Sequence, residues 1–228
     1  YQNLLNDLAG LDAVQDWIFQ QPDATIDTPA AVEAAEIFQG WITSGYYPEG
    51  VNGIDYTTAL GRFAAGEGVF YLSGNWDVAS LEEQMGDNVG FFAAPPVSAD
   101  GTVTAMTSPT TPFGIPANAE HKDAAAAFLN WLTSDAARQI QADQGYPPVG
   151  SADAAAPTVD AGTVNAEVQE AFAQLSEADA LVDFVNNATA GIQASGWVPN
   201  LQLLVSGDLT PEAFVEAMQS TYEDELGR

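Results

Sequence analysis

The sequence predicts an α/β fold, in which short buried strands alternate with amphipathic helices. Two apolar runs, residues 69–72 and 89–93, are short and bounded by glycine or proline, which is typical of strands inside a sheet. A third strand is expected at residues 111–115. Helical spacing of apolar residues separates these runs, and strands separated by helices indicate a sheet with helical covers.

Helix starts support this assignment. Thr28 followed by Pro29 is typical of a helix N-terminus, and the same pair of residue types recurs at residues 210–211 near the end of the chain. Apolar residues at helical spacing also predict a helix over residues 118–133. The small, polar stretch 151–162 suits an exposed connection.

The 228 residues include 46% hydrophobic residues, enough for one large core or two smaller ones. Trp17, Trp41 and Trp131 lie on apolar helical stripes and are expected in the core. No apolar stretch approaches the roughly 20 residues that cross a bilayer, and no secretory signal stands at the start. The chain opens without Met inside an amphipathic pattern, so we expect a fragment whose native N-terminus is missing.

The charge balance is extreme, with 32 acidic and 4 basic residues and a formal net charge of -28. Nucleic acid is excluded as a partner because its binding depends on Lys and Arg at phosphates, and anionic lipid is disfavoured for the same reason. Two explanations of the acidity stay open. It could be an adaptation to high salt, which screens carboxylate repulsion, or it could attract a cationic ligand.

Residues with catalytic or metal-binding chemistry are few. The chain has no cysteine, which excludes disulfides and thiolate metal sites, and His121 is its single histidine. We expect His121 on the surface, and neither a G-x-S-x-G turn nor a nucleotide-binding glycine motif occurs. Paired carboxylates could hydrolyse a glycoside, but nothing distinguishes two of the 32. We therefore expect no catalytic residue, no metal site and no cofactor.

One constellation remains, the turn Ser73-Gly74-Asn75-Trp76-Asp77 directly after the first predicted strand. In open α/β folds, ligands bind beyond the ends of the strands. The flat face of Trp76 could stack on a pyranose ring, while Asn75 or Asp77 could bond its hydroxyl groups. The alternative is a tryptophan packed beneath a loop.

A longer pattern surrounds this turn: Phe63-Ala64-Ala65-Gly66, the run 69–72, Gly74-Asn75-Trp76 and a strand ending at Pro95. It resembles the sugar-binding family of ABC-transporter solute-binding proteins, which are maltose-binding-protein-like and have the type 2 periplasmic-binding-protein fold. Further motifs continue the likeness in the family's order: Phe113-Gly114-Ile115-Pro116, residues 124–132, Gly145-Tyr146-Pro147-Pro148 and residues 207–212.

The resemblance implies a two-lobed α/β protein with its ligand in the cleft between the lobes. Residues 1–103 would form the first part of the C-terminal lobe, and residues 104–160 a segment of the N-terminal lobe. Residues 161–228 would add the closing helices of the C-terminal lobe. Much of the N-terminal lobe would then be missing from this sequence.

The same resemblance implies a set of ligand-binding residues: Trp76, Asn75, Asp77, Tyr1, Trp197, Tyr47 and Thr110. Trp76 matches the family's sugar-stacking tryptophan. Tyr1 stands just before a helix where a ligand-facing aromatic often occurs, and Trp197 is about one turn from the matching position of another. Thr110 lies at the crossing where many members carry Gly-Gly. For Tyr47, packing at the rim is favoured over ligand contact.

The implied function is the binding of a carbohydrate, a mono- or oligosaccharide, and its delivery to the permease subunits of an ABC importer. We expect an extracytoplasmic monomer, periplasmic or lipid-anchored at the outer face of the cell membrane, with its signal segment outside this sequence. The acidity keeps one alternative open, a binding protein of the same architecture for a cationic solute such as a polyamine or peptide. A carbohydrate-active enzyme is a less favoured alternative.

Overall fold

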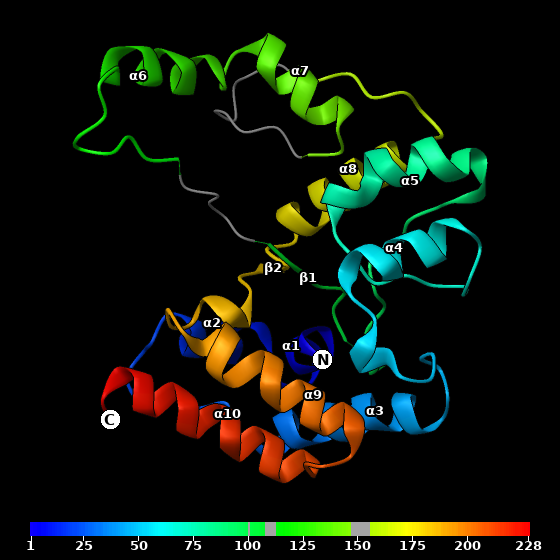
Figure 1. The fold of residues 1–228 in the computed structure, drawn as a ribbon, viewed down its shortest axis with the longest axis vertical. Coiled ribbons are helices and arrows are strands. Elements are labelled where there is room, and N and C mark those ends of the chain that lie inside the picture. The colour runs from blue at the N-terminus through cyan, green and yellow to red at the C-terminus, as the bar shows by residue number, and fades with distance from the viewer. Residues whose placement is uncertain (100, 108–112, 147–155) are drawn as a thin grey trace. The chain divides into compact units, whose positions relative to one another are not determined.

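A computed structural model describes residues 1–99, 101–107, 113–146 and 156–228 (Figure 1). Contacts between Cα atoms group the chain into two units. Unit 1 consists of Tyr1–Tyr56, Ala93–Pro109 and Ala178–Arg228, and unit 2 of Thr57–Phe92 and Thr110–Glu177. The lobe boundaries predicted after residues 103 and 160 stay predictions, and unit 2 combines segments from both sides of the first of them.

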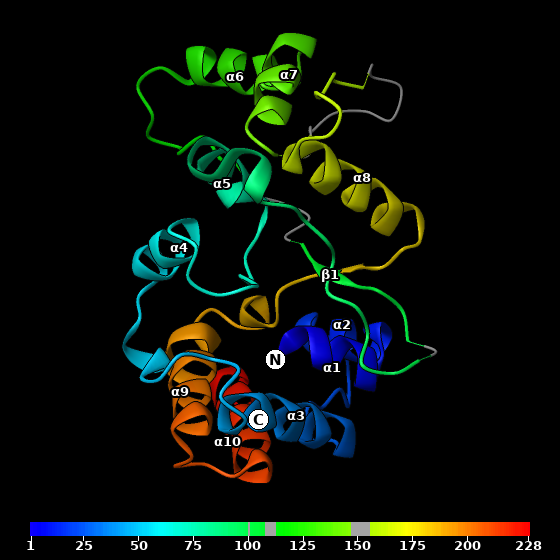
Figure 2. The same ribbon diagram turned by 90° about the vertical axis from the view of Figure 1, so that its right-hand side faces the viewer.

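Unit 1 is mostly helical. Its elements are α1 (Gln2–Ala9), α2 (Leu11–Ile18), α3 (Pro29–Thr43), η1 (Val51–Gly53), β1 (Ala105–Met106), β2 (Leu181–Val182), η4 (Val185–Asn187), the π-helical turn η5 (Gln193–Trp197), α9 (Val198–Ser206) and α10 (Pro211–Leu226). Figures 1 and 2 show α3, α9 and α10 packed together, with α1 against α3.

The core of unit 1 forms between these helices. Its largest fully buried side chains include Leu5, Trp17, Ile192, Leu204, Phe214 and Tyr222. The Trp17 ring stacks on that of Tyr222 at 4.5 Å between centroids. The predicted core positions of Trp17 and Trp41 are therefore confirmed, Trp17 as a buried residue and Trp41 as a partly buried one packed against the core.

Helices α3 and α10 begin where the sequence predicts. The Thr28 hydroxyl accepts the N–H of Ala31 at 3.2 Å, and the Thr210 hydroxyl accepts the N–H of Ala213 at 3.2 Å. In each helix a proline follows the cap, at a position whose N–H has no intrahelical partner. Each cap contributes about 1 kcal/mol to helix stability.

The strands of the described chain, β1 and β2, form a two-stranded parallel sheet within unit 1. Ala105 lies opposite Leu181, and Met106 lies opposite Val182. The N–H of Thr107 donates to the Val182 carbonyl at 2.8 Å. This pairing joins two segments that are far apart in the sequence. The Val182 side chain of β2 is part of the buried core of unit 1.

Unit 2 is built from shorter helices. They are α4 (Tyr56–Ala64, whose first residue belongs to unit 1), η2 (Asn75–Asp77), α5 (Val78–Met85), η3 (Gly86–Asn88), α6 (Lys122–Trp131), α7 (Asp135–Asp143) and α8 (Val164–Glu177). Its small apolar core joins Val78 of α5 to Val164 and Val168 of α8, with Val89 packed against them. No helix of the described residues is both long and apolar enough to span a bilayer.

The strands predicted at residues 69–72 and 89–93 are not formed. Val69, Phe70 and Leu72 are exposed, and Phe70 instead packs edge-to-face on Phe92 at 5.8 Å. A strand forms only where a neighbouring strand satisfies its backbone groups, and no described segment pairs with either run. Residues 113–115 are likewise not a strand, and residues 111–112 lie outside the described part of the chain.

The helix predicted over residues 118–133 is present in its central part as α6. Its apolar face, however, is exposed. Trp131 is 44% exposed and stacks on Phe128 at 5.9 Å, so the predicted core position of Trp131 is wrong. Helical periodicity identifies which residues share a face, but it does not say what covers that face.

A buried amide links three segments of unit 1. The Gln219 Oε1 atom accepts the indole N–H of Trp17 at 3.1 Å and the backbone N–H of Ile26 at 3.0 Å. We expect Gln219→Met to lower the free energy of unfolding by about 2 to 4 kcal/mol, because two buried donors lose their acceptor. Urea unfolding measures this change.

Gln202→Met is the matched control, since Gln202 is exposed on α9. We expect its effect to stay within about 0.5 kcal/mol. Equal stabilities of the two variants would contradict the role given to the Gln219 amide.

Candidate functional site

In the turn at residues 73–77, the indole ring of Trp76 packs on the backbone of Gly74. A Cβ atom at Gly74 would lie 2.4 Å from two carbon atoms of the Trp76 ring and 2.7 Å from a third. Only glycine therefore permits this position of the indole. Trp76 is 48% exposed, so about half of the residue is accessible to solvent although its ring packs on the Gly74 backbone.

Asp77 closes the same turn from the inside. Its side chain is buried, at 4% exposure, and accepts a short hydrogen bond from the Ser73 hydroxyl. Its backbone N–H donates to the Gly74 carbonyl at 3.2 Å. The Asp77 carboxylate therefore supports the turn and is directed away from solvent, in contrast to the neighbouring indole.

Asn75 joins the Trp76 turn to a turn 70 residues further along the chain. Its Nδ2 atom donates to the Gly145 carbonyl at 3.1 Å. Gly145 follows α7 with a positive φ of 81°, and a Cβ there would lie 2.7 Å from the Val78 side chain. Glycine is thus required at position 145 by conformation and by space.

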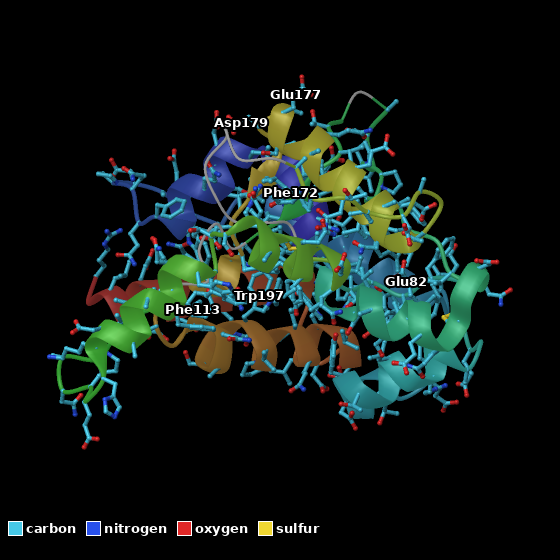
Figure 3. The ribbon with its side chains drawn as sticks, turned by 90° about the horizontal axis from the view of Figure 1, so that it is seen from above. Glu82, Phe113, Phe172, Glu177, Asp179 and Trp197 are labelled. Carbon is cyan, nitrogen blue, oxygen red and sulfur yellow. The ribbon has the colours of Figure 1, made fainter. Side chains whose placement is uncertain are left out.

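Two further polar contacts hold the helices around these turns. The Glu82 carboxylate on α5, labelled in Figure 3, accepts the N–H of Asn165 at 2.9 Å in the first turn of α8. The Asn165 amide in turn donates to the Ala142 carbonyl of α7 at 2.7 Å. A carboxylate at a helix N-terminus is favourable because the first N–H groups lack intrahelical acceptors.

Tyr1 and Trp197 meet in unit 1. Their ring centroids are 5.5 Å apart, and the Tyr1 ring also packs edge-to-face on Phe214 at 5.0 Å. The Tyr1 hydroxyl donates to the Ala31 carbonyl at 3.1 Å, and burial raises the pKa of this phenol. In this structure Tyr1 therefore serves the packing of α1 against α3.

Trp197 is the last residue of η5, and Figure 3 shows it labelled there. Single π-helical turns are uncommon and occur often at functional sites. Glu225 of α10 holds η5 and the residues before it. Its carboxylate accepts the N–H of Gly191 at 3.0 Å and the hydroxyl of Ser195, within η5, at 2.6 Å. The Thr189 hydroxyl also donates to it.

Tyr47 and Thr110 are the remaining candidates. Tyr47 packs edge-to-face on Phe38 at 6.0 Å, and burial raises the pKa of its phenol. This agrees with the packing role favoured for it. Thr110 lies outside the described residues. The structure thus brings Trp76 together with Asn75 and Asp77, and separately Tyr1 with Trp197.

Two sets of residues that hold these groups in place were not predicted from the sequence. One is Gly145 with its neighbour Tyr146, and the other is Glu225. The motif that contains Gly145 and Tyr146 was part of the resemblance, so it carried a signal. Its contact with Asn75 had none, because nothing in the sequence links residues 70 positions apart. Glu225 is one carboxylate among many, and only the fold distinguishes it.

The comparisons with known proteins agree with this architecture. The family profile described as bacterial extracellular solute-binding protein matches residues 5–173. The match covers well over half of the chain, so this chain belongs to that family. A search of curated proteins gives no match.

Among solved structures, a protein named chitin oligosaccharide binding protein has the same fold, with a TM-score of 0.72 and 20% sequence identity. The alignment covers 97% of this chain and 55% of that chain, so the chain spans about half the length of that relative. The predicted fold class is confirmed as the helix-rich α/β fold of a solute-binding protein, present here in part.

Glu225 gives a prediction that depends on pH. Hydrogen bonds from Ser195 and Thr189 hold the pKa of this carboxyl below its usual value of 4.5. A lowered pKa means that the ionised form stabilises the fold above about pH 4.5, and this stabilisation is lost as the pH falls through the lowered pKa. We expect Glu225→Gln to lower the Tm at pH 7, and this difference to shrink below pH 4.5.

Thermal unfolding followed by circular dichroism from pH 3 to 8 measures the difference. Glu216→Gln, at an exposed position on the same helix, is the control and should leave the Tm nearly unchanged. A Glu225→Gln difference that stayed constant across this range would show that ionisation of Glu225 plays no part.

Proposed function

We propose that this chain is part of a binding protein that captures a carbohydrate and delivers it to the permease of an ABC importer, without catalysing a reaction. The family is one of extracellular solute-binding proteins, which supports an extracytoplasmic location. Anchoring by a lipid at the outer face of the cell membrane belongs to the same proposal. The similar solved structure is named for binding a chitin oligosaccharide, which supports a saccharide as ligand.

The observation that carries this proposal is the half-exposed indole of Trp76 on the Gly74 backbone. A flat aromatic face that is already fixed loses little conformational entropy when a sugar ring stacks on it. Asn75 uses one amide hydrogen for Gly145, which leaves its second hydrogen and its carbonyl oxygen for ligand hydroxyl groups. Trp76 and Asn75 would together supply stacking and polar recognition.

The other candidate residues take supporting places in this proposal. Asp77 would hold the turn instead of contacting the ligand, because its carboxylate is buried on Ser73. Trp197 and Tyr1, which are both partly buried, would form a second aromatic group. Tyr47 and Thr110 remain candidates from the resemblance.

A cationic ligand is the rival that the acidic composition suggested. It would require carboxylates facing the site. At the Trp76 turn the nearest one in sequence, Asp77, is buried and already accepts a hydroxyl hydrogen. Within the described residues, no group of three or more acidic or histidine side chains is arranged to hold a metal ion. The turn is therefore better suited to a neutral saccharide.

Removing the indole tests the site. In the full-length protein, we expect Trp76→Ala to weaken saccharide binding at least about tenfold, which corresponds to about 1.4 kcal/mol, because the stacking surface is lost. Isothermal titration calorimetry with a panel of oligosaccharides measures this loss. Trp131→Ala, which removes a similarly exposed indole from α6, is the matched control and should keep the affinity within about twofold.

Gly74→Ala tests the same site without removing any aromatic group. The new Cβ would collide with the indole and turn it away, so the affinity should fall although Trp76 is intact. Gly61→Ala adds the same methyl group in α4, where nothing lies within 4 Å, and should leave binding unchanged. Unaltered affinity in both Trp76→Ala and Gly74→Ala would refute this site.

A further inference from the structure

The turn after α7 contacts the Trp76 turn through close backbone packing as well as through a hydrogen bond. Besides the bond from Asn75 to the Gly145 carbonyl, a Cβ at Gly145 would lie 3.1 Å from the Asn75 carbonyl oxygen. The two backbones are therefore nearly in van der Waals contact. With standard backbone dimensions, the Cα atoms of Trp76 and Tyr146 are at most about 11 Å apart.

Tyr146 stands directly after this contact on a fixed backbone. Its N–H donates to the Gln141 carbonyl at 2.9 Å, and the Gly145 N–H donates to the Ala142 carbonyl at 3.0 Å, which together cap α7. The Gln141 amide donates to the Leu132 carbonyl at 3.0 Å. The direction in which the chain leaves α7 is thereby set by several hydrogen bonds.

The Tyr146 side chain is 45% exposed, nearly the same fraction as Trp76. Neither ring belongs to the small apolar core of unit 2. An aromatic side chain that is held on a hydrogen-bonded turn and left about half exposed to solvent has a surface available for stacking. The described part of unit 2 thus presents two aromatic residues on two turns that are bonded to each other.

We infer that Tyr146 is a second aromatic platform of the ligand site and that the ligand is an oligosaccharide of at least two sugar units. This inference rests on the proposed function. Two aromatic rings on separate turns are each covered when two consecutive sugar rings occupy them, one sugar ring on each. A single sugar ring held between both would instead make Tyr146→Ala weaken monosaccharide and oligosaccharide binding equally, and that result would overturn the inferred ligand length. Asn75 lies between the platforms and bonds the sugar hydroxyl groups there.

The test uses the full-length protein and calorimetry with cello-, malto- and chito-oligosaccharides of one to four units. Tyr146→Ala should weaken binding of the best di- to tetrasaccharide about tenfold and leave any binding of the monosaccharide within about twofold. Tyr146→Phe should keep the wild-type affinity, because the ring is retained. Tyr146→Leu keeps apolar bulk without a flat ring and should show the loss, which covers the case in which the alanine variant does not fold.

Tyr46→Ala is the matched control, since Tyr46 is 76% exposed in unit 1 and should not alter binding. If Trp76→Ala weakens oligosaccharide binding while Tyr146→Ala and Tyr146→Leu bind like the wild type, the role of Tyr146 is overturned and the proposed function stands. If the wild-type protein binds none of these saccharides, the proposed function fails, and the inference about Tyr146 fails with it.

Discussion

The candidate site depends on the contact between the Trp76 ring and the backbone of Gly74. An indole is large and flat, and it keeps one face open only if something rigid and without bulk supports the other. The Gly74 backbone, which carries no side chain, provides that support. The hydrogen bond between Ser73 and Asp77 closes the turn. The hydrogen bond from Asn75 to Gly145 then fixes a second turn at the same place. Trp76 is thus fixed before any ligand arrives.

The acidic composition shapes how these turns are held. With four basic residues in the sequence, few carboxylates can form ion pairs, and several instead accept hydrogen bonds from the backbone. Asp7 accepts the N–H groups of Val97 and Ser98, and Glu167 accepts that of Phe91. Glu82 and Glu225 do the same at α8 and before η5. Hydrogen bonds to a charged acceptor are stronger than those between neutral groups. In this chain, carboxylates therefore stabilise loops through hydrogen bonds to the backbone instead of through ion pairs.

The sequence predicted those features that arise from neighbouring residues. The caps at Thr28 and Thr210 are visible because a cap and its helix are contiguous, and the Trp76 turn is visible for the same reason. The strand predicted at residues 69–72 failed because a strand needs a partner whose position no local pattern reveals. For the same reason, the sequence could not predict the hydrogen bond from Asn75 to Gly145. It also could not show which of the 32 acidic residues would bond the residues around η5, as Glu225 does.

The proposed function rests on a sugar ring stacking on the indole of Trp76. A crystal structure of the full-length protein with a bound oligosaccharide tests it most directly. We expect a sugar ring stacked on the indole of Trp76, with Asn75 bonded to its hydroxyl groups. A bound oligosaccharide that leaves the face of Trp76 uncovered and contacts other residues would contradict the account.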